Sequence, residues 1–305
     1  MNELLTDIKS LEIETLKNLR NSKSFNTLRA YKSDYSDFVL FCSKNNFSPM
    51  PADPKILSLY LTHLSQTSKF STLKRRIASI SVIHKLKGHY IDTKHPLIIE
   101  NLLGIKRLKG SNQKAKKPIL IRDLVEIINV INALKVKEEV KLRDKALILV
   151  GFAGGFRRSE LVSIEHEDVE FVREGVKIFV KRSKTDQSGE GMTKAIPSFD
   201  NVKYCPVQHL ENWIFTKKEK KGKIFSISDR SVALIIKKYT NLAGLDSTKY
   251  AGHSLRSGFA TSTAESGAEE RNIMAMTGHK TTQMVRRYIQ EANLFKNNAL
   301  NKIKI

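Results

Sequence analysis

One basic stretch punctuated by glycine and proline divides this chain into two parts. Between Lys106 and Pro118 the sequence reads Lys-Arg-Leu-Lys-Gly-Ser-Asn-Gln-Lys-Ala-Lys-Lys-Pro. Such a polar, cationic composition is typical of a linker rather than of a packed element. Because each side must then bury its own apolar surface, and 305 residues suffice for two cores, we expect two domains. The predicted boundaries are residues 1–107, a linker at 108–118, and residues 119–305.

The part before the linker has the apolar spacing of helices. A first amphipathic helix is predicted where apolar residues recur at steps of three and four, at Leu28, Tyr31, Tyr35, Phe38, Val39 and Cys42. Asp53-Pro54 predicts the cap and first residue of a second helix. A third helix opens at Ser71, with one apolar side formed by Leu73, Ile77, Ile80 and His84. The expected N-terminal domain is therefore all-helical.

The part after the linker combines helices with a short β-hairpin. A helix with Asp123 near its start carries an inner face of Leu124, Ile127, Ile128 and Ile131. Residues 175–182 alternate as a strand does, and Thr193 to Ile196 follow as a return strand that ends at Pro197. A further helix is predicted from Ser231 to Ala243, and Trp213 is expected in the core. The fold class is mainly α, with an all-helical N-terminal domain and an α+β second domain that is mostly helical.

Charge indicates a polyanionic partner. The chain carries 53 Lys and Arg against 31 Asp and Glu, a formal charge of +22, which favours nucleic acid binding. A merely basic protein without such a partner is the alternative. Cys42 and Cys205 lie far apart and outside any zinc-ligand spacing, so neither a disulfide framework nor a metal site is predicted. The first residues show no basic segment followed by an apolar one, and no apolar run approaches 18 residues. We therefore expect a cytoplasmic protein that does not cross a membrane.

The stretch from Gly252 to Tyr288 concentrates side chains that fit phosphoryl chemistry. His253 and Arg256 lie three residues apart, and this helical spacing predicts that both point to one side. Thr277-Gly278-His279 predicts a break between helices, and Tyr288 follows nine residues later, directly after two arginines. Each of these residues alone would more often be structural than catalytic.

Taken in order, His-x-x-Arg, Gly-His and a later Tyr near the C-terminus resemble the second motif box of the tyrosine recombinase (phage integrase) family. The run Gly151-Phe-Ala-Gly-Gly-Phe-Arg157-Arg-Ser-Glu160-Leu161 fits no nucleotide-binding loop. It is similar to the family's first box, in which Arg157 is the first active-site arginine and Glu160 supports the site. Lys184, in Arg-Ser-Lys-Thr, resembles the family's hairpin lysine, with Lys181 and Lys194 as competitors. The resemblance implies a catalytic domain of the DNA breaking-rejoining type.

A metal-free phosphoryl transfer needs fixed cations, because negative charge builds on the non-bridging oxygens. The resemblance implies that Tyr288 attacks the scissile phosphate and forms a 3′-phosphotyrosyl link, with no cofactor and no metal ion. Arg157 and Arg256 would hold the non-bridging oxygens, and His279 would donate a further hydrogen bond. His253 would act as acid and base near the nucleophile, and Lys184 would protonate the leaving 5′-oxygen.

The resemblance also implies how the rest of the chain meets double-stranded DNA. The N-terminal domain would be the core-binding domain, and the basic linker would let the two domains close as a clamp; a flexible spacer is the alternative. Candidate DNA contacts are Lys74, Arg75, Lys85, Lys106 and Arg107. Leu294, Leu300 and Ile303 are spaced as on a helix, and the family resemblance implies that such a tail passes to a neighbouring protomer, giving a homotetramer on two sites.

Two features depart from the family pattern, and two other functions remain open. Thr277 stands where a leucine usually precedes Gly-His, and Ser254 differs from chromosomal dimer-resolving members; neither removes a catalytic group. A type IB topoisomerase would use the same residues to relax DNA, and a non-catalytic homologue would only bind it. The expected activity is site-specific DNA recombination in integration, excision or resolution.

Overall fold

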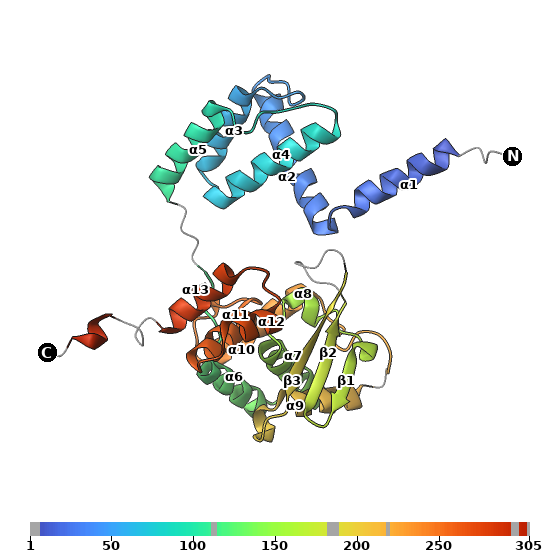
Figure 1. The fold of residues 1–305 in the computed structure, drawn as a ribbon, viewed down its shortest axis with the longest axis vertical. Coiled ribbons are helices and arrows are strands. Elements are labelled where there is room, and N and C mark those ends of the chain that lie inside the picture. The colour runs from blue at the N-terminus through green and yellow to red at the C-terminus, as the bar shows by residue number, and fades with distance from the viewer. Residues whose placement is uncertain (1–6, 111–114, 182–188, 218–219, 294–298, 304–305) are drawn as a thin grey trace. The chain divides into compact units, whose positions relative to one another are not determined.

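A computed structural model describes residues 7–110, 115–181, 189–217, 220–293 and 299–303. The chain forms two compact units, Met1–Lys114 and Ala115–Ile305 (Figure 1). The described part of unit 1 is entirely helical, and unit 2 combines helices with a small sheet, which confirms the predicted fold class.

Along its described residues, unit 1 contains five helices: α1 (Ile8–Asn21), α2 (Phe25–Lys44), α3 (Pro54–Ser65), α4 (Phe70–Leu86) and α5 (Pro96–Lys109). The predicted cap is present, because the Asp53 carboxylate accepts a hydrogen bond from the Lys55 amide at 2.6 Å. The apolar stripes meet in one core that includes Phe38, Leu57 and Ile80. The helices α1 and α5 were not individually predicted.

His84 is buried in unit 1, and both of its ring nitrogens have backbone partners. Its Nε2 accepts a hydrogen bond from the Ala52 amide at 3.1 Å, and its Nδ1 lies 2.9 Å from the Ile80 carbonyl oxygen. Since a carbonyl only accepts, the ring of His84 carries its proton on Nδ1.

Unit 2 contains eight α-helices within its described residues: α6 (Ile121–Ala133), α7 (Glu138–Ala153), α8 (Arg158–Leu161), α9 (Pro206–Thr216), α10 (Asp229–Leu242), α11 (Ser254–Glu265), α12 (Glu270–Thr277) and α13 (Thr282–Asn293). Its strands β1 (Val169–Val172), β2 (Gly175–Val180) and β3 (Met192–Pro197) form an antiparallel sheet in the order β1-β2-β3. Val176 pairs with Phe171 on one side and with Ile196 on the other. Short 3₁₀ turns lie at His166–Asp168, Val202–Tyr204, Ser247–Lys249 and Ala299–Lys302.

The helix α7 runs through the core of unit 2, where the sheet and α9 lie beside it (Figure 1). Residues 144–151 of α7 are all buried, so this part of the helix is enclosed on every side rather than amphipathic. Trp213 is buried as predicted, and its indole N–H donates to the Ile224 carbonyl at 3.0 Å.

The chain that enters unit 2 lies against the start of α11. The Lys117 amide donates to the Lys249 carbonyl at 2.8 Å, and the Ile119 amide donates to the Ser254 carbonyl at 2.9 Å. Gly258 permits this approach, because a Cβ at this position would lie 1.9 Å from the Ile119 carbonyl oxygen. The entry segment thereby fixes the helix that carries Arg256.

Some local features were not given by the sequence analysis. The helix that follows Arg157 ends at Leu161, and a 3₁₀ turn forms at His166–Asp168. The strand β1 was not predicted, and α4 begins one residue before Ser71. Within the described ranges, no helix is both long and apolar enough to cross a bilayer.

Candidate active site

Arg157 is held by Glu160 at the start of α8. One Glu160 oxygen accepts from the Arg157 amide at 2.9 Å, and the other accepts from its guanidinium at 2.5 Å. Glu160 is buried, so this charged pair is shielded from solvent screening. Nη2 of Arg157 lies 3.5 Å from the Gly278 carbonyl oxygen. Glu160 therefore holds both the backbone amide and the guanidinium of Arg157 in position.

The helix α11 carries His253 and Arg256 at its N-terminal end. His253 is the cap residue directly before the helix, and Arg256 lies in its first turn. Arg256 donates to the Gly155 carbonyl at 2.8 Å and to Nε2 of His279 at 3.1 Å, and its side chain has no exposed surface. The Nε–H of Arg256 has no hydrogen-bond partner among the described residues, which leaves a buried donor for a ligand oxygen.

A left-handed turn at Gly278 directs His279 toward Arg256. Gly278 ends α12 with φ of 62° and ψ of 38°, a conformation that glycine adopts without steric cost. On the other side of the ring, Nδ1 of His279 lies 2.7 Å from the hydroxyl of Thr277. Both residues are buried. The Gly-His motif is thus a turn that places an imidazole beside a guanidinium.

Tyr288 comes from α13, which packs on α11. Its half-buried ring contacts a small apolar cluster of Ala260, Ala264, Ile273 and Val285. The ring centroids of Tyr288 and His279 are 6.1 Å apart. The helix therefore brings the phenol next to the imidazole of the Gly278 turn.

These side chains line one open cavity of about 550 Å³ in unit 2. The residues at its wall are Arg157, Arg158, Ser159, Asp229, His253, Arg256, His279, Met284, Arg287 and Tyr288. Five of the seven predicted catalytic residues thus meet in one place, although 131 positions separate Arg157 from Tyr288 in the sequence. Glu160 lies behind Arg157, and Lys184 lies outside the described residues.

The two competitors of Lys184 are both engaged in other contacts. Lys181 forms ion pairs with Glu165 at 2.6 Å, Glu167 at 2.5 Å and Asp168 at 3.1 Å. These carboxylates raise the pKa of Lys181. Lys194 is fully buried on β3 and donates to the carbonyls of Gly154 and Met276 at 2.7 and 2.5 Å. Both amines are therefore occupied by contacts within the protein.

Burial and crowding of cations depress the proton affinity of the site. The pKa of Arg256 falls to about 10 because of burial and the nearby charge of Arg157. Burial, followed by the charge of Arg256, lowers the pKa of His279 to about 4. The same two causes lower the pKa of His253. An anion in the cavity would offset the repulsion between these cationic groups, so the site favours binding of a negatively charged group.

Five cavity residues were not named by the sequence analysis as site residues: Arg158, Ser159, Asp229, Met284 and Arg287. Asp229 lies at the rim and pairs with Arg158 at 3.9 Å; its place at the start of α10 gave no sequence signal. Arg287 precedes Tyr288 and lines the cavity, whereas the adjacent Arg286 pairs with Glu270 at 3.4 Å. Met284 lies four residues before Tyr288, a helical step that could have indicated the shared face.

The predicted DNA contacts of unit 1 lie on α4 and α5. All five are exposed: Lys74, Arg75, Lys85, Lys106 and Arg107. Arg75 is not an isolated cation, because it pairs with the buried carboxylate of Asp34, and the Lys74 amine lies 5.4 Å from the centre of the Phe70 ring.

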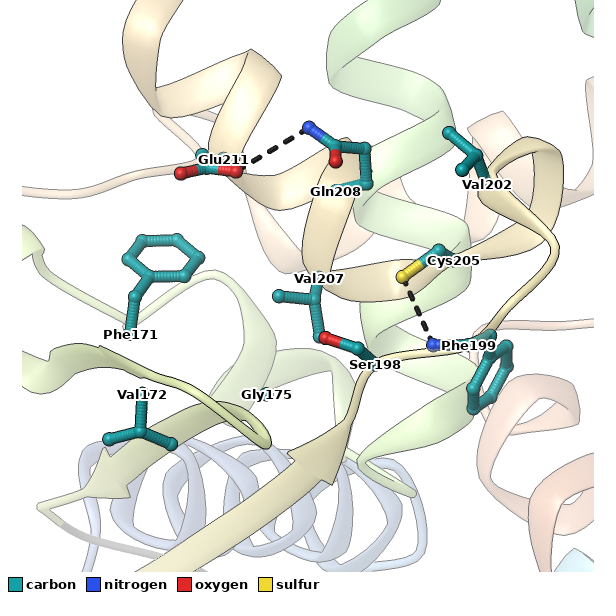
Figure 2. Close-up of a pocket in the computed structure, with 10 residues that line it drawn as sticks. All are labelled: Phe171, Val172, Gly175, Ser198, Phe199, Val202, Cys205, Val207, Gln208 and Glu211. Atoms are coloured by element: carbon teal, nitrogen blue, oxygen red, sulfur yellow. Dashed lines mark hydrogen bonds between the residues drawn. The ribbon is translucent and has the colours of Figure 1, made fainter.

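Two further cavities of unit 2 contain none of the predicted catalytic residues. Figure 2 shows the smaller, about 240 Å³, between β1 and the start of α9, where Cys205 Sγ accepts from the Phe199 amide at 3.3 Å. Gln208 donates to Glu211 at 3.4 Å along its edge. The larger, about 690 Å³, is apolar and is lined by α6, α7, β3 and α11, with Val125, Phe152, Ala195, Phe259 and Met276 among its residues.

Guanidinium groups, imidazoles and one phenol in a common cavity are the donor set needed for phosphoryl transfer to a tyrosine. Comparisons with known proteins agree with this reading. The sequence profile of the phage integrase family matches residues 121–294. An integrase/recombinase xerD homolog of Selenomonas ruminantium is 40% identical over 317 aligned residues, which cover 99% of this chain and 92% of that protein.

More distant relatives extend the comparison. The tyrosine recombinase XerC of Syntrophus aciditrophicus (strain SB) is 26% identical over 300 aligned residues, covering 91% of each protein. Among solved structures, XerH site-specific recombinase bound to palindromic difH substrate in a post-cleavage complex shares the fold, with a TM-score of 0.62 and 16% identity over 81% of this chain and 73% of that one. This chain belongs to the phage integrase family, the tyrosine recombinases.

Proposed function

We propose that this chain is a tyrosine-type site-specific DNA recombinase that cuts and rejoins double-stranded DNA through a covalent tyrosyl intermediate. The observation that carries the proposal is the convergence of Arg157, His253, Arg256, His279 and Tyr288 on one cavity. Family membership supports the same activity.

The chemistry follows from the charges of the site. The phenol oxygen of Tyr288 attacks the scissile phosphorus, and the bond from phosphorus to the 5′-oxygen breaks, leaving a 3′-phosphotyrosyl ester. Arg157 and Arg256 stabilise the negative charge that grows on the non-bridging oxygens, because arginine offers several fixed donors. His253 takes the phenolic proton, and Lys184 gives a proton to the departing 5′-oxygen. A 5′-hydroxyl of the partner duplex then reverses the step, so rejoining needs no external energy source.

Removal of one arginine tests the cavity assignment. Arg157→Ala should lower the single-turnover cleavage rate by at least about 100-fold, the loss seen when one oxyanion donor is removed. The exposed Arg173, on the turn between β1 and β2, provides a matched control, because Arg173→Ala removes the same charge away from the cavity. Equal cleavage rates for the two variants would contradict the role of Arg157.

Strand exchange distinguishes recombination from relaxation. Sites selected by the protein from a random duplex library, placed on two differently labelled duplexes, should yield duplexes that carry both labels. A topoisomerase would relax supercoiled DNA and leave the labels unmixed, and a non-catalytic homologue would do neither. Tyr288→Phe should bind the selected site and yield no exchange.

The C-terminal tail supports assembly into a homotetramer on two sites. Leu300 and Ile303 are exposed and lie three residues apart, so both can insert into an apolar surface. The apolar cavity of about 690 Å³ lined by α6, α7, β3 and α11 suits these side chains. We infer that the tail of one protomer occupies this cavity of its neighbour, a head-to-tail contact that closes into a ring. Leu294, the third apolar residue of the tail, lies outside the described residues.

Charged substitutions test this contact from both sides. Leu300→Asp/Ile303→Asp and, separately, Ala195→Glu in the cavity should abolish the four-protomer complex on DNA while binding to a single site persists. Leu234→Asp, at an exposed apolar position of α10, is the control and should assemble normally. Tetramers formed by a chain truncated at Ala292 would contradict the proposed exchange.

A further inference from the structure

Thr277 lies at the centre of a buried polar chain that ends on the imidazole of His279. Its hydroxyl oxygen is 2.5 Å from the Ile273 carbonyl and 2.7 Å from Nδ1 of His279. Thr277 has no exposed surface and His279 has 9%. The Thr277 hydroxyl and Nδ1 of His279 therefore find their hydrogen-bond partners within the protein.

The guanidinium of Arg256 fixes the direction of each hydrogen bond in this row of buried polar groups. A guanidinium has no acceptor, so the 3.1 Å contact from Arg256 requires Nε2 of His279 to accept. The neutral ring must then carry its proton on Nδ1, which donates to the Thr277 oxygen. The single hydroxyl hydrogen of Thr277 in turn donates to the Ile273 carbonyl. A leucine or valine at position 277 would leave the Nδ1–H without an acceptor in a buried place.

We propose that Thr277 is a positioning residue for the reaction, whose hydroxyl fixes the ring orientation and the Nδ1–H tautomer of His279. In the free chain the site then presents Nε2 as an acceptor. Nε2 becomes a donor to a phosphate oxygen only when the ring takes up a second proton from solvent. In both protonation states, Nδ1–H of His279 donates to the Thr277 oxygen. The ring therefore does not have to turn when Nε2 changes from an acceptor to a donor.

The groups that face His279 decide when that proton is taken up. They are Arg256 on α11, Arg157 before α8, His253 at the start of α11, Lys194 on β3 and Tyr288 on α13. The cations disfavour the imidazolium, and a bound phosphodiester anion counteracts them. The consequence for catalysis rests on the proposed function, whereas the tautomer of the free chain does not.

Nitrogen NMR of the free protein tests the tautomer directly. With ¹⁵N-labelled histidine, Nδ1 of His279 should show the signal of a protonated nitrogen and Nε2 that of an unprotonated one. His84 is an internal reference with the same tautomer, and His279→Asn identifies the signal. Thr277→Val should shift the His279 signals toward a mixture of tautomers, and Thr277→Ser should restore them. An Nε2–H ring in the natural protein, or unchanged signals in Thr277→Val, would overturn the proposal.

Cleavage kinetics test whether the fixed tautomer matters for the reaction. At saturating DNA, Thr277→Val should lower the single-turnover rate about 10-fold, and Thr277→Ser should stay within about threefold. Thr240→Val is the matched control, because buried Thr240 makes the same contact to the carbonyl four residues earlier, at 2.9 Å, without a histidine; it should cleave at the natural rate. Equal losses in the two valine variants would reduce Thr277 to a structural role. Absence of cleavage by the natural chain would contradict the proposed function and leave the NMR result standing.

Discussion

Two buried basic side chains, Arg256 and Lys194, contribute to the candidate site in different ways. Arg256 faces the cavity and keeps its charge, because even a pKa of about 10 exceeds any working pH. Lys194 lies behind the cavity, where burial lowers its pKa to about 7. Its two carbonyl contacts join the Gly154 turn before Arg157 to the end of α12 before His279. Lys194 therefore connects the two halves of the candidate site.

The buried amine of Lys194 predicts a pH-dependent stability. The ordinary pKa of a lysine amine is 10.5. Between pH 7 and 10.5, Lys194 of the unfolded chain therefore holds a proton that Lys194 of the folded chain has released. Stability should rise with pH across this window, with a slope of up to about 1.4 kcal/mol per pH unit. Urea unfolding of the natural chain and of Lys194→Met, at several pH values, measures the difference.

Lys194→Met removes this titration, so the stability of the natural chain should improve relative to the variant as the pH increases from 7. Two curves that stay parallel from pH 7 to 10.5 would show that the Lys194 amine keeps its ordinary proton affinity.

At the residue scale, the sequence predicted which side chains belong to the site better than it predicted what surrounds each of them. The order of motifs was enough to name His279, but its tautomer depends on where the Gly278 turn directs the ring relative to Thr277. In the sequence, Thr277 was only a departure from a family pattern. Lys194 was a competitor for the hairpin acid until its burial between two carbonyls was visible, because a strand pattern does not reveal what lies across from it.

At the element scale, α11 is the helix on which the site depends. It carries Arg256, its N-terminal end receives the entry segment 117–119, and its residues Ala260 and Ala264 pack against α13 with Tyr288. Gly258 is the point of closest approach, where the backbone of Ile119 leaves no room for a side chain. A shift of this helix would move two predicted catalytic groups together.

Gly258→Ala should therefore destabilise unit 2, by about 1–3 kcal/mol or more, because the obstacle is a backbone carbonyl that a side-chain rotation cannot relieve. Gly104 on α5 is the control, since a Cβ there meets nothing within 4 Å. Gly104→Ala should stabilise unit 1 by about 0.5–1 kcal/mol. Thermal unfolding followed separately for the two units measures both. A Gly258→Ala chain as stable as the natural one would contradict the packing of the entry segment on α11.

The long amphipathic helices were predictable because their apolar residues repeat over several turns, as in α2 and α6. The short elements were not. The four residues of β1 form a strand only through their pairing with β2, and α8 ends after one turn. The core helix α7 is buried on all sides along residues 144–151 and so gave no amphipathic signal.

At the scale of the whole molecule, each unit has its own core, and the chain as a whole carries a charge of +22. Exposed cations on α4 and α5 are candidates for the phosphate backbone of DNA. Phosphate contacts release counterions, and each one contributes about −0.9 to the slope of log affinity against log salt concentration.

Lys106→Gln/Arg107→Gln should therefore reduce the magnitude of that slope by about 1.8 in total if both residues contact phosphate. Lys249→Gln is the control, because Lys249 is paired with Asp246 at 3.0 Å in unit 2. Binding isotherms at four or more salt concentrations give the slopes. An unchanged slope in the double variant would exclude these two predicted contacts.

The central claim is that the phenol of Tyr288 becomes esterified to DNA. A selected site with a nick beside the cleavage position loses its short 5′-hydroxyl fragment after cleavage, so the covalent complex accumulates. We expect a protein–DNA adduct that survives boiling in detergent, and peptide mass spectrometry should locate the nucleotide on Tyr288. Absence of an adduct, or an adduct on another residue that persists in Tyr288→Phe, would contradict the account.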